Sequence, residues 1–412
     1  MKRNSATKNE FRKGFLGGLC CMAAAVTAVL YLSGCTDAGT LFRNRFTRGI
    51  AEQTVEEKDV RDKLSDIAYI IDAYYYDDVT SDQVEEGMYR GILSSLNDPY
   101  SQYYNAEEYR SMQEETAGSY YGIGTVLQQD RETKKVTIRH VYKGSPAQDA
   151  GLKDGDVILS VDGTAADGQE LSELVKLVKG QEGTSVPIVV QREDVAEELE
   201  FDVERRKVEV PTVECQMLPD NVGFLQISEF SELTPVQFKS AVEDLKAQGM
   251  TALIVDVRDN PGGVLDSVAD VLDQVLPEGL VVYMEDKYGE REEYDSSGET
   301  YLDLPLAVLV NENSASASEI FAGAIKDYEY GTLIGTKTFG KGIVQSIIGL
   351  DDGSAVKVTI AKYFTPKGNY IHGVGISPDI ELEYAYQNPE DTEYNPMHDN
   401  QVQKALEVLK NR

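Results

Sequence analysis

The chain has 412 residues, with 39 Lys and Arg against 71 Asp and Glu, and its formal charge at pH 7 is -32. This length allows two or three domains with sizeable cores. A hydrophobic content of 41% and a charged content of 27% are typical of a soluble globular protein. Because so acidic a chain repels nucleic acid and anionic lipid, we discount both as partners of its soluble part.

The first 35 residues have the composition of a targeting sequence. Basic residues at positions 2–13 precede an almost uninterrupted apolar or small segment from Phe15 to Leu32. Such a segment directs export and is excluded from reasoning about the fold. It closes with a Leu-Ser-Gly-Cys sequence that resembles a bacterial lipobox, which predicts lipidation of Cys35. An uncleaved membrane anchor is the alternative, since about 18 apolar residues can just span a bilayer. Both alternatives predict an extracytoplasmic protein that is tethered to the cell membrane.

Only one cysteine, Cys215, lies beyond position 35. A single thiol forms neither an internal disulfide nor a zinc site, so we expect Cys215 to be a small, half-buried hydrophobic residue. No other group of residues has the spacing of metal ligands, and we expect neither a metal nor a cofactor.

The region 36–117 is predicted to be helical. Apolar residues recur at helical spacing from Val60 to Tyr74, and again from Ser81 to Leu96, where an Asn-Asp-Pro sequence ends the second helix. Two such helices alone bury too little apolar surface to form a core of their own. We therefore expect them to pack on another domain or on a second copy of the chain.

The region 118–205 contains short β-type segments separated by Gly, Pro and Asp, with one helix at 169–178. It begins with the sequence Tyr121-Gly122-Ile123-Gly124. Glycines before a strand let consecutive backbone N–H groups point into one concavity, which can bind the terminal carboxylate of a peptide. The peptide then adds as a strand beside the helix. A lone Gly-Ile-Gly is more often a tight turn, but with the Lys-Gly-Ser-Pro-Ala and Gly-Leu-Lys-Asp-Gly-Asp sequences that follow, the region resembles a PDZ domain.

Strands and helices alternate in the region 206–385, before a polar tail and a helix at 386–412. Strands are predicted at 222–227, 251–257, 280–284 and 306–310, which implies a largely parallel sheet flanked by helices. Ligand chemistry in such α/β folds takes place beyond the carboxyl ends of the strands. A Pro-Gly-Gly turn and a run of alternating serines both occupy such ends.

The histidines do not support a Ser-His-Asp triad. The chain has three, His140, His372 and His398, and none is near a serine in a nucleophile-like motif. We interpret His372 as a structural residue of a loop.

Ser316 follows a predicted strand and precedes a predicted helix, and this position has two interpretations. With Glu319 it forms a Ser-x-x-Glu capping box, in which the serine only caps the helix. A strand–turn–helix can also expose a nucleophilic serine. In that case the first helical N–H, here on Ala317, faces the developing oxyanion.

An activated serine needs a base, and Lys341 is the candidate. A lysine can serve if desolvation lowers its pKa from about 10.4 towards 7–8. Lys341 lies between two glycines and close to the apolar residues Phe339, Ile343 and Val344. A solvated turn is one alternative. A phosphate-binding loop is another, which we reject because a glycine replaces the Ser or Thr that would hold Mg²⁺ and the following residues favour a strand over a helix.

The run from Ser314 to Glu319, with Phe-Gly-Lys-Gly and Gln345 downstream, resembles the signature of the carboxyl-terminal processing peptidases, also called tail-specific proteases. The resemblance continues in the motifs at 98–101, 121–124, 260–263 and 363–376, and it covers nearly everything from about residue 60 to 385. Several separate motifs in the expected order argue against chance similarity.

The resemblance implies a role for each matching residue. It implies Ser316 as the nucleophile, Lys341 as the general base and Gln345 as the partner that orients the base. The oxyanion-hole N–H groups would come from Gly262 and Ala317, with Gly263 as the alternative to Gly262. Residues four apart in a plain strand lie about 13 Å apart, so the chain would have to curl after Lys341 for Gln345 to reach it.

The resemblance also implies a crotonase-like α/β core with an inserted PDZ domain, and frequently a homodimer. The resulting hypothesis is an exported serine endopeptidase that cleaves proteins near their C-termini, while Tyr121, Gly122, Ile123 and Gly124 hold the substrate tail. The main alternative is a catalytically silent PDZ scaffold, against which the intact Ser316 and Lys341 argue. The core fold by itself also suggests an acyl-thioester enzyme, but an extracytoplasmic location would deprive it of substrate.

Overall fold

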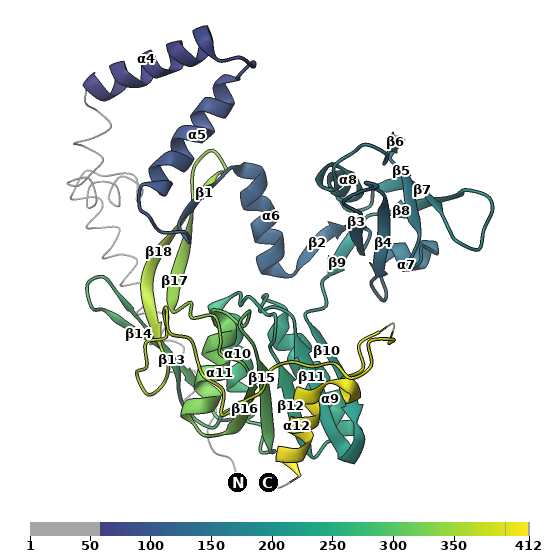
Figure 1. Cartoon of the computed structure of the whole chain (residues 1–412), viewed down its shortest axis with the longest axis vertical. Helices are drawn as coiled ribbons and strands as arrows, with labels where there is room; N and C mark the ends of the chain where they lie inside the picture. Colours follow the sequence, from purple (N-terminus) through teal and green to yellow (C-terminus); the bar gives the residue numbers. More distant parts are fainter. Residues whose placement is uncertain (1–57, 392, 411–412) are drawn as a thin grey trace, which may run out of the picture. The chain divides into compact units, whose positions relative to one another are not determined.

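The computed structural model describes residues 58–391 and 393–410, so the leader and the lipobox cysteine Cys35 lie outside the described residues (Figure 1). The chain divides into two compact units, 1–88 and 89–412. Helix α4 (Lys58–Tyr74) and helix α5 (Ser81–Ser94) confirm the two predicted helices, and neither contains a buried residue. Within the described ranges, no helix is both long enough and apolar enough to cross a membrane.

A six-stranded sheet forms the centre of the α/β core (Figure 1). In spatial order its strands are β10 (Val213–Leu218), β11 (Val222–Ile227), β12 (Ala252–Asp256), β15 (Leu306–Val310), β16 (Gly331–Gly335) and β19 (Ile380–Glu381). The strands from β11 to β19 are parallel, and only β10 pairs antiparallel. The predicted parallel sheet is therefore present, but the strand predicted at 280–284 is not part of it, because that segment pairs antiparallel in a second sheet.

Alternate residues of these strands enter two separate cores. One core packs the sheet against α9 (Thr234–Ala247), α10 (Leu265–Asp273) and α11 (Ala317–Asp327). The other packs it against α12 (Asn400–Leu409). Strand β12 shows the division, because Leu253 and Val255 belong to the first core and Ile254 to the second. Both faces of the sheet are thus covered, which leaves the ends of its strands for chemistry.

A second, antiparallel sheet adjoins this core. Its strands are β1 (Gln102–Tyr104), β13 (Gly279–Asp286), β14 (Arg291–Ser296), β17 (Ile343–Gly349) and β18 (Ala355–Phe364). Strands β17 and β18 form a hairpin whose register shifts between Val344 and Gln345. This hairpin follows Lys341 directly.

Helix α6 (Ala106–Ala117) precedes a β-rich domain that begins with a two-stranded ribbon of β2 (Ser119–Gly122) and β9 (Arg206–Glu209). The domain's sheet consists of β3 (Thr125–Gln129), β4 (Val136–Val141), β5 (Val157–Val161), β7 (Ser185–Gln191) and β8 (Leu199–Glu204), with β6 (Thr164–Ala165) beside β5. Two helices, α7 (Pro146–Ala150) and α8 (Leu171–Val178), complete it, and it has its own apolar core. Strand β3 is an edge strand that pairs only with β4 among the described strands, and α8 contacts it.

The expectation that Cys215 is half-buried was wrong. Cys215 is exposed on β10. The reason is that β10 lies at the edge of the sheet, where it has a neighbouring strand on one side only.

Candidate active site

Ser316 occupies a strained turn between β15 and α11. Its φ of 53° and ψ of -114° lie outside the regions that a residue with a side chain normally adopts, and such strain costs about 1–3 kcal/mol. The turn is held through the backbone, since the Ser316 N–H donates to Glu319 Oε2 at 3.0 Å and its carbonyl accepts from Tyr363 Oη at 3.0 Å. The predicted capping box is present, with the Glu319 carboxylate on the Ser316 N–H and the Ser316 side chain towards the Glu319 N–H. The Glu319 N–H also donates to the Ser316 carbonyl at 2.8 Å, so the start of α11 does not depend on the Ser316 hydroxyl alone.

The two neighbouring serines point elsewhere. Ser314 Oγ donates to the carbonyl of Val257 at 2.7 Å, and Ser318 Oγ donates to the carbonyl of Asn260 at 2.9 Å. Both side chains are completely buried. They tie the serine run to the end of β12, and Ser316 alone of the three lines a cavity.

Glu319 connects the turn of Ser316 to the segment that carries Lys341. Its side chain is completely buried. Oε2 accepts the N–H of Ser316 at 3.0 Å and the N–H of Lys341 at 2.7 Å. Oε1 accepts the N–H of Gly340 at 2.7 Å and the hydroxyl of Thr338 at 2.6 Å. One carboxylate thus fixes the backbones of both candidate catalytic residues.

Lys341 is partly buried at the start of the β17–β18 hairpin. Loss of water around its side chain lowers the pKa of Lys341, and repulsion from Lys357 lowers it further, while the carboxylates of Asp98 and Glu319 act in the opposite direction. Its Nζ lies 4.9 Å from the centre of the Tyr100 ring. In the described part of the chain, no hydrogen bond or ion pair engages this Nζ. The net effect is a pKa of Lys341 below that of free lysine.

Gln345 lines the same cavity as Lys341 but does not bond to it in this conformation. Its Nε2 donates to Thr359 Oγ1 at 3.3 Å. The register shift between Val344 and Gln345 leaves Ile360 of the opposite strand β18 without a partner. The irregularity therefore lies after Gly342, where the sequence predicted a curl, and Gln345 does not reach Lys341 in this conformation.

The glycines of the Pro-Gly-Gly turn lie against the serine turn. A Cβ placed on Gly262 would come within 2.7 Å of Ser316 Cβ and 2.9 Å of the Ala317 nitrogen. The Gly262 N–H donates to Asn260 Oδ1 at 2.8 Å. In this conformation Gly262 is therefore engaged, whereas no hydrogen bond is found for the N–H of Gly263 or Ala317 among the described residues. Gly263 and Ala317 both line the same cavity as Ser316.

Ser316, Lys341 and Gln345 all line one cavity of about 410 Å³. Gly262, Gly263 and Ala317 line it too. Lys357 adds a second cation to the wall, and Glu115 and Glu229 add two carboxylates. Burial, and then repulsion from Glu115, raise the pKa of the Glu229 carboxyl. In the ranges that the structure covers, no group of three or more His, Cys, Asp or Glu side chains is arranged to hold a metal ion.

None of the three histidines makes a hydrogen bond with Ser316 in the described structure. His372 Nδ1 accepts from the Gly342 N–H at 3.4 Å, and its ring lies near Tyr100 and Tyr370. His140 bonds to Asp154, and His398 bonds to Asp391. The histidine arrangement of a catalytic triad is therefore missing here, and His372 stabilises the loop beside Lys341.

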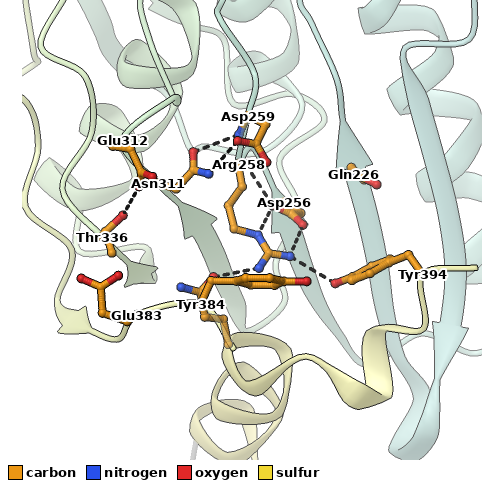
Figure 2. Close-up of a pocket in the computed structure, with 11 residues that line it drawn as sticks. Gln226, Asp256, Arg258, Asp259, Asn311, Glu312, Thr336, Glu383, Tyr384 and Tyr394 are labelled. Atoms are coloured by element: carbon orange, nitrogen blue, oxygen red, sulfur yellow. Dashed lines mark hydrogen bonds and ion pairs between the residues drawn. The ribbon is translucent and has the colours of Figure 1, made fainter. Parts of the chain in front are cut away.

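A second cavity, of about 450 Å³, surrounds the side chain of Arg258 (Figure 2). Arg258 pairs with Asp256 at 2.6 Å and with Asp399 at 2.8 Å, and it also contacts Tyr394 Oη at 3.2 Å. Both carboxylates and the arginine are buried. Two carboxylates already balance the charge of Arg258, and their ion pairs join the end of β12 to the start of α12. We therefore interpret this network as structural.

The predicted carboxylate-binding segment of the β-rich domain is only partly open. Tyr121 and Gly122 end strand β2 and pair with β9. Ile123 is buried, and Gly124 has a φ of 81°, which favours glycine. Burial raises the pKa of the Tyr120 phenol to about 12, while the N–H groups of Gly124 and Thr125 act in the opposite direction.

Comparisons with known proteins agree with this architecture. Family models match as "Peptidase family S41" over residues 221–382, "PDZ domain" over 137–192 and "Activating protease CtpB N-terminal domain" over 35–108. A "Probable CtpA-like serine protease" of Staphylococcus epidermidis is 36% identical over 360 residues, which cover 86% of this chain and 72% of that protein. A protein of the same description from Staphylococcus aureus is 36% identical over 324 residues, 78% of this chain and 64% of that one. A solved structure of a putative S41 protease from Bacteroides fragilis has a TM-score of 0.51 at 19% identity, covering 78% of this chain and 90% of that one, and supports the fold alone.

An α/β core that matches a peptidase family, together with a PDZ domain and serine protease relatives, defines a serine-type protease. The chain belongs to peptidase family S41, in its C-terminal processing branch. The predicted fold class is confirmed, with an α/β peptidase core, a PDZ domain and an N-terminal helical segment.

Two parts of the site were not assigned from the sequence. Glu319 was interpreted only as half of a capping box, although its spacing from Ser316 was the available signal. Thr359, which Gln345 contacts, had no sequence signal of its own, because it becomes a neighbour only through the pairing of β17 with β18.

Proposed function

We propose that this chain is a membrane-tethered extracytoplasmic endopeptidase in which Ser316 is the nucleophile and Lys341 is the general base. One observation carries this proposal: Glu319 bonds the backbone N–H groups of both residues, and both side chains line the same cavity. A catalytically silent scaffold would need neither the strained turn of Ser316 nor the desolvation of Lys341.

The reaction follows from these positions. Neutral Lys341 Nζ takes the proton of Ser316 Oγ as this oxygen attacks the scissile carbonyl carbon of the substrate. The N–H groups of Ala317 and of a glycine of the Pro-Gly-Gly turn stabilise the negative charge on the carbonyl oxygen. Protonated Lys341 then gives its proton to the leaving amine, and a peptide bond breaks as the acyl-enzyme ester forms. Water, deprotonated by Lys341, hydrolyses the ester and regenerates Ser316.

The role of Gln345 is to orient Lys341. In the free enzyme its amide contacts Thr359 at 3.3 Å. Hydrogen bonds of catalytic groups are often long in unliganded enzymes and shorten in the substrate complex. We therefore assign Gln345 to the positioning of Nζ once a substrate fills the cavity.

Location and assembly follow from the N-terminal region. The basic and apolar leader supports export, and the lipobox-like sequence supports a lipid anchor on Cys35. Helices α4 and α5 expose large apolar residues and bury none. These exposed apolar faces support a homodimer, because a second copy of the chain would remove them from water.

The catalytic proposal is tested with Ser316→Ala, Ser314→Ala and Ser318→Ala. Protein beginning at residue 36 is incubated with unfolded substrates that end in apolar tails, and the fragments are identified by mass spectrometry. Ser316→Ala is expected to abolish cleavage with its melting temperature nearly unchanged. The other two variants are expected to lose far less activity, because their hydroxyls bond to backbone carbonyls outside the cavity. Equal losses in all three variants, or full activity of Ser316→Ala, would contradict the assignment of the nucleophile.

Capture of the substrate tail by the PDZ domain is tested separately. Peptides with a free C-terminus should have a lower KM than amidated ones, because N–H groups bond a carboxylate more strongly than a neutral amide. Gly122 pairs with Arg206, so residues 123–205 can be replaced by an Asn-Gly turn that keeps the β2–β9 ribbon. This variant should treat both peptides alike. If the intact enzyme already treats them alike, tail selection comes from the catalytic cavity instead.

A further inference from the structure

The motif Asp98-Pro99-Tyr100-Ser101 lies between α5 and β1, and the proposed reaction does not use it. Its aspartate is nonetheless the centre of a hydrogen-bond network. Asp98 Oδ1 accepts the N–H of Tyr100 at 3.0 Å, and Oδ2 accepts the hydroxyls of Ser101 and Thr359, each at 2.6 Å. Ser101 Oγ in turn accepts the N–H of Thr359 at 3.1 Å. The aspartate therefore fixes both its own loop and strand β18.

The contact with Thr359 leads to Gln345. Thr359 Oγ1 donates its proton to Asp98, so its lone pairs are free to accept the Gln345 amide. Thr359 and Gln345 are register partners immediately after the irregularity of the hairpin. By accepting the proton of Thr359 Oγ1, Asp98 orients this hydroxyl so that its oxygen can accept the Gln345 amide.

The contact with Tyr100 leads to Lys341. The Asp98 carboxylate holds the backbone of Tyr100, whose ring lies 4.9 Å from Lys341 Nζ. The Tyr100 ring also meets His372 edge-on at 6.4 Å between ring centres, and His372 accepts from the residue after Lys341. The ring therefore forms one side of the environment of Nζ.

We propose that Asp98 is a positioning residue, which holds Tyr100 against Lys341 and directs Thr359 towards Gln345. It touches neither Ser316 nor the scissile bond, and it acts through the base and its partner. This inference rests on the proposed function, because the lysine that Asp98 positions is the proposed general base.

The charge of Asp98 also affects the pKa of Lys341. Burial and Lys357 lower the pKa of Lys341, whereas Asp98 and Glu319 raise it. Asp98 itself stays ionised at neutral pH: partial burial raises its pKa, but the hydrogen bonds from Ser101, Thr359 and Tyr100 and the proximity of His372 outweigh this effect and hold it below its ordinary value. Removing the charge of Asp98 must therefore lower the pKa of Lys341, and an enzyme that needs neutral lysine becomes active at lower pH.

The experiment uses the full chain with three substitutions and one control. Asp98→Asn removes the charge and keeps an acceptor oxygen. Thr359→Val removes the hydroxyl that joins Asp98 to Gln345, and Thr359→Ser keeps it. Asp352→Asn is the matched control, because Asp352 also accepts an N–H and a hydroxyl of a following serine, but it lies in the exposed β17–β18 turn. Two quantities are measured: kcat and KM as a function of pH, and the titration of Lys341 by NMR of ¹³C-labelled lysine, with its signal assigned by its loss in Lys341→Arg.

With Asp98→Asn, the NMR titration of Lys341 and the acid limb of kcat/KM should both move to lower pH, and with Asp352→Asn neither should move. Thr359→Val should lower kcat by about tenfold to 100-fold, as a misplaced catalytic group does, with little change in KM. Thr359→Ser should keep most of the wild-type kcat.

Two results would overturn the inference: a Lys341 titration that is the same in Asp98→Asn and Asp352→Asn, or wild-type kcat in Thr359→Val. Either result would show that the motif only builds the loop. An active Lys341→Arg would instead refute the lysine as general base. The NMR titration would still decide the inference in that case, because it follows the proton on Lys341 without reference to catalysis.

Discussion

Replacement of Glu319 by glutamine is expected to cost both stability and activity. The wild-type carboxylate accepts four hydrogen bonds, two on each oxygen, from Thr338, Gly340, Lys341 and Ser316. Glutamine keeps one oxygen and presents an NH₂ group to the other two donors. Each buried donor without a partner costs about 1–3 kcal/mol. Glu319→Gln should therefore destabilise the enzyme by about 2–6 kcal/mol. For a domain of this size, the lower figure corresponds to a fall in melting temperature of about 4–8 °C.

The loss of activity should exceed what the loss of stability explains. If the glutamine NH₂ replaces Oε2, it faces the N–H groups of both Ser316 and Lys341. If it replaces Oε1, it faces the donors of Thr338 and Gly340, just before Lys341. In either orientation the substitution displaces the base relative to the nucleophile. A displacement of about 1 Å can cost about 100-fold in rate. Calorimetry gives the melting temperature, and peptide cleavage well below that temperature gives kcat. Ser314→Ala is the control, because it removes a buried hydrogen bond without touching either catalytic backbone. A Glu319→Gln enzyme that melts earlier but keeps kcat within twofold of wild type would refute the reasoning.

Three further predictions concern single residues. Activity should rise with pH through a pKa below that of free lysine, because burial lowers the pKa of Lys341 and the neutral amine is the base; Lys341→Arg should be inactive at every pH, since guanidinium keeps its proton. Gly262→Ala should abolish cleavage, because its Cβ would lie 2.7 Å from Ser316 Cβ, whereas Gly144→Ala, with positive φ but open space, should keep kcat; equal activity of the two variants would exclude the contact. Arg258→Ala should lower the free energy of unfolding by about 3–5 kcal/mol, since it leaves two buried carboxylates unpaired; denaturant unfolding that changes by less than 1 kcal/mol would contradict this estimate.

The sequence determined the elements and the chemistry that they present. Alternating strands and helices predicted the parallel sheet, and the periodicity of residues 60–74 predicted α4. Ser316 could be placed in a strand–turn–helix because its neighbours specify both elements locally, and the glycines around Lys341 marked a residue that could pack closely. These predictions depend on residues that are near one another in the chain, where propensity and spacing act directly.

The tertiary structure alone decided how distant residues meet. The bond between Asp98 and Thr359 spans 261 positions, and the buried Glu319 reaches Lys341 across 22. The register shift beside Gln345, and the close approach of Gly262 to Ser316, likewise follow from strand register and loop packing. No local preference encodes such contacts, because they exist only after two cores have formed and have fixed the ends of their strands against the antiparallel sheet.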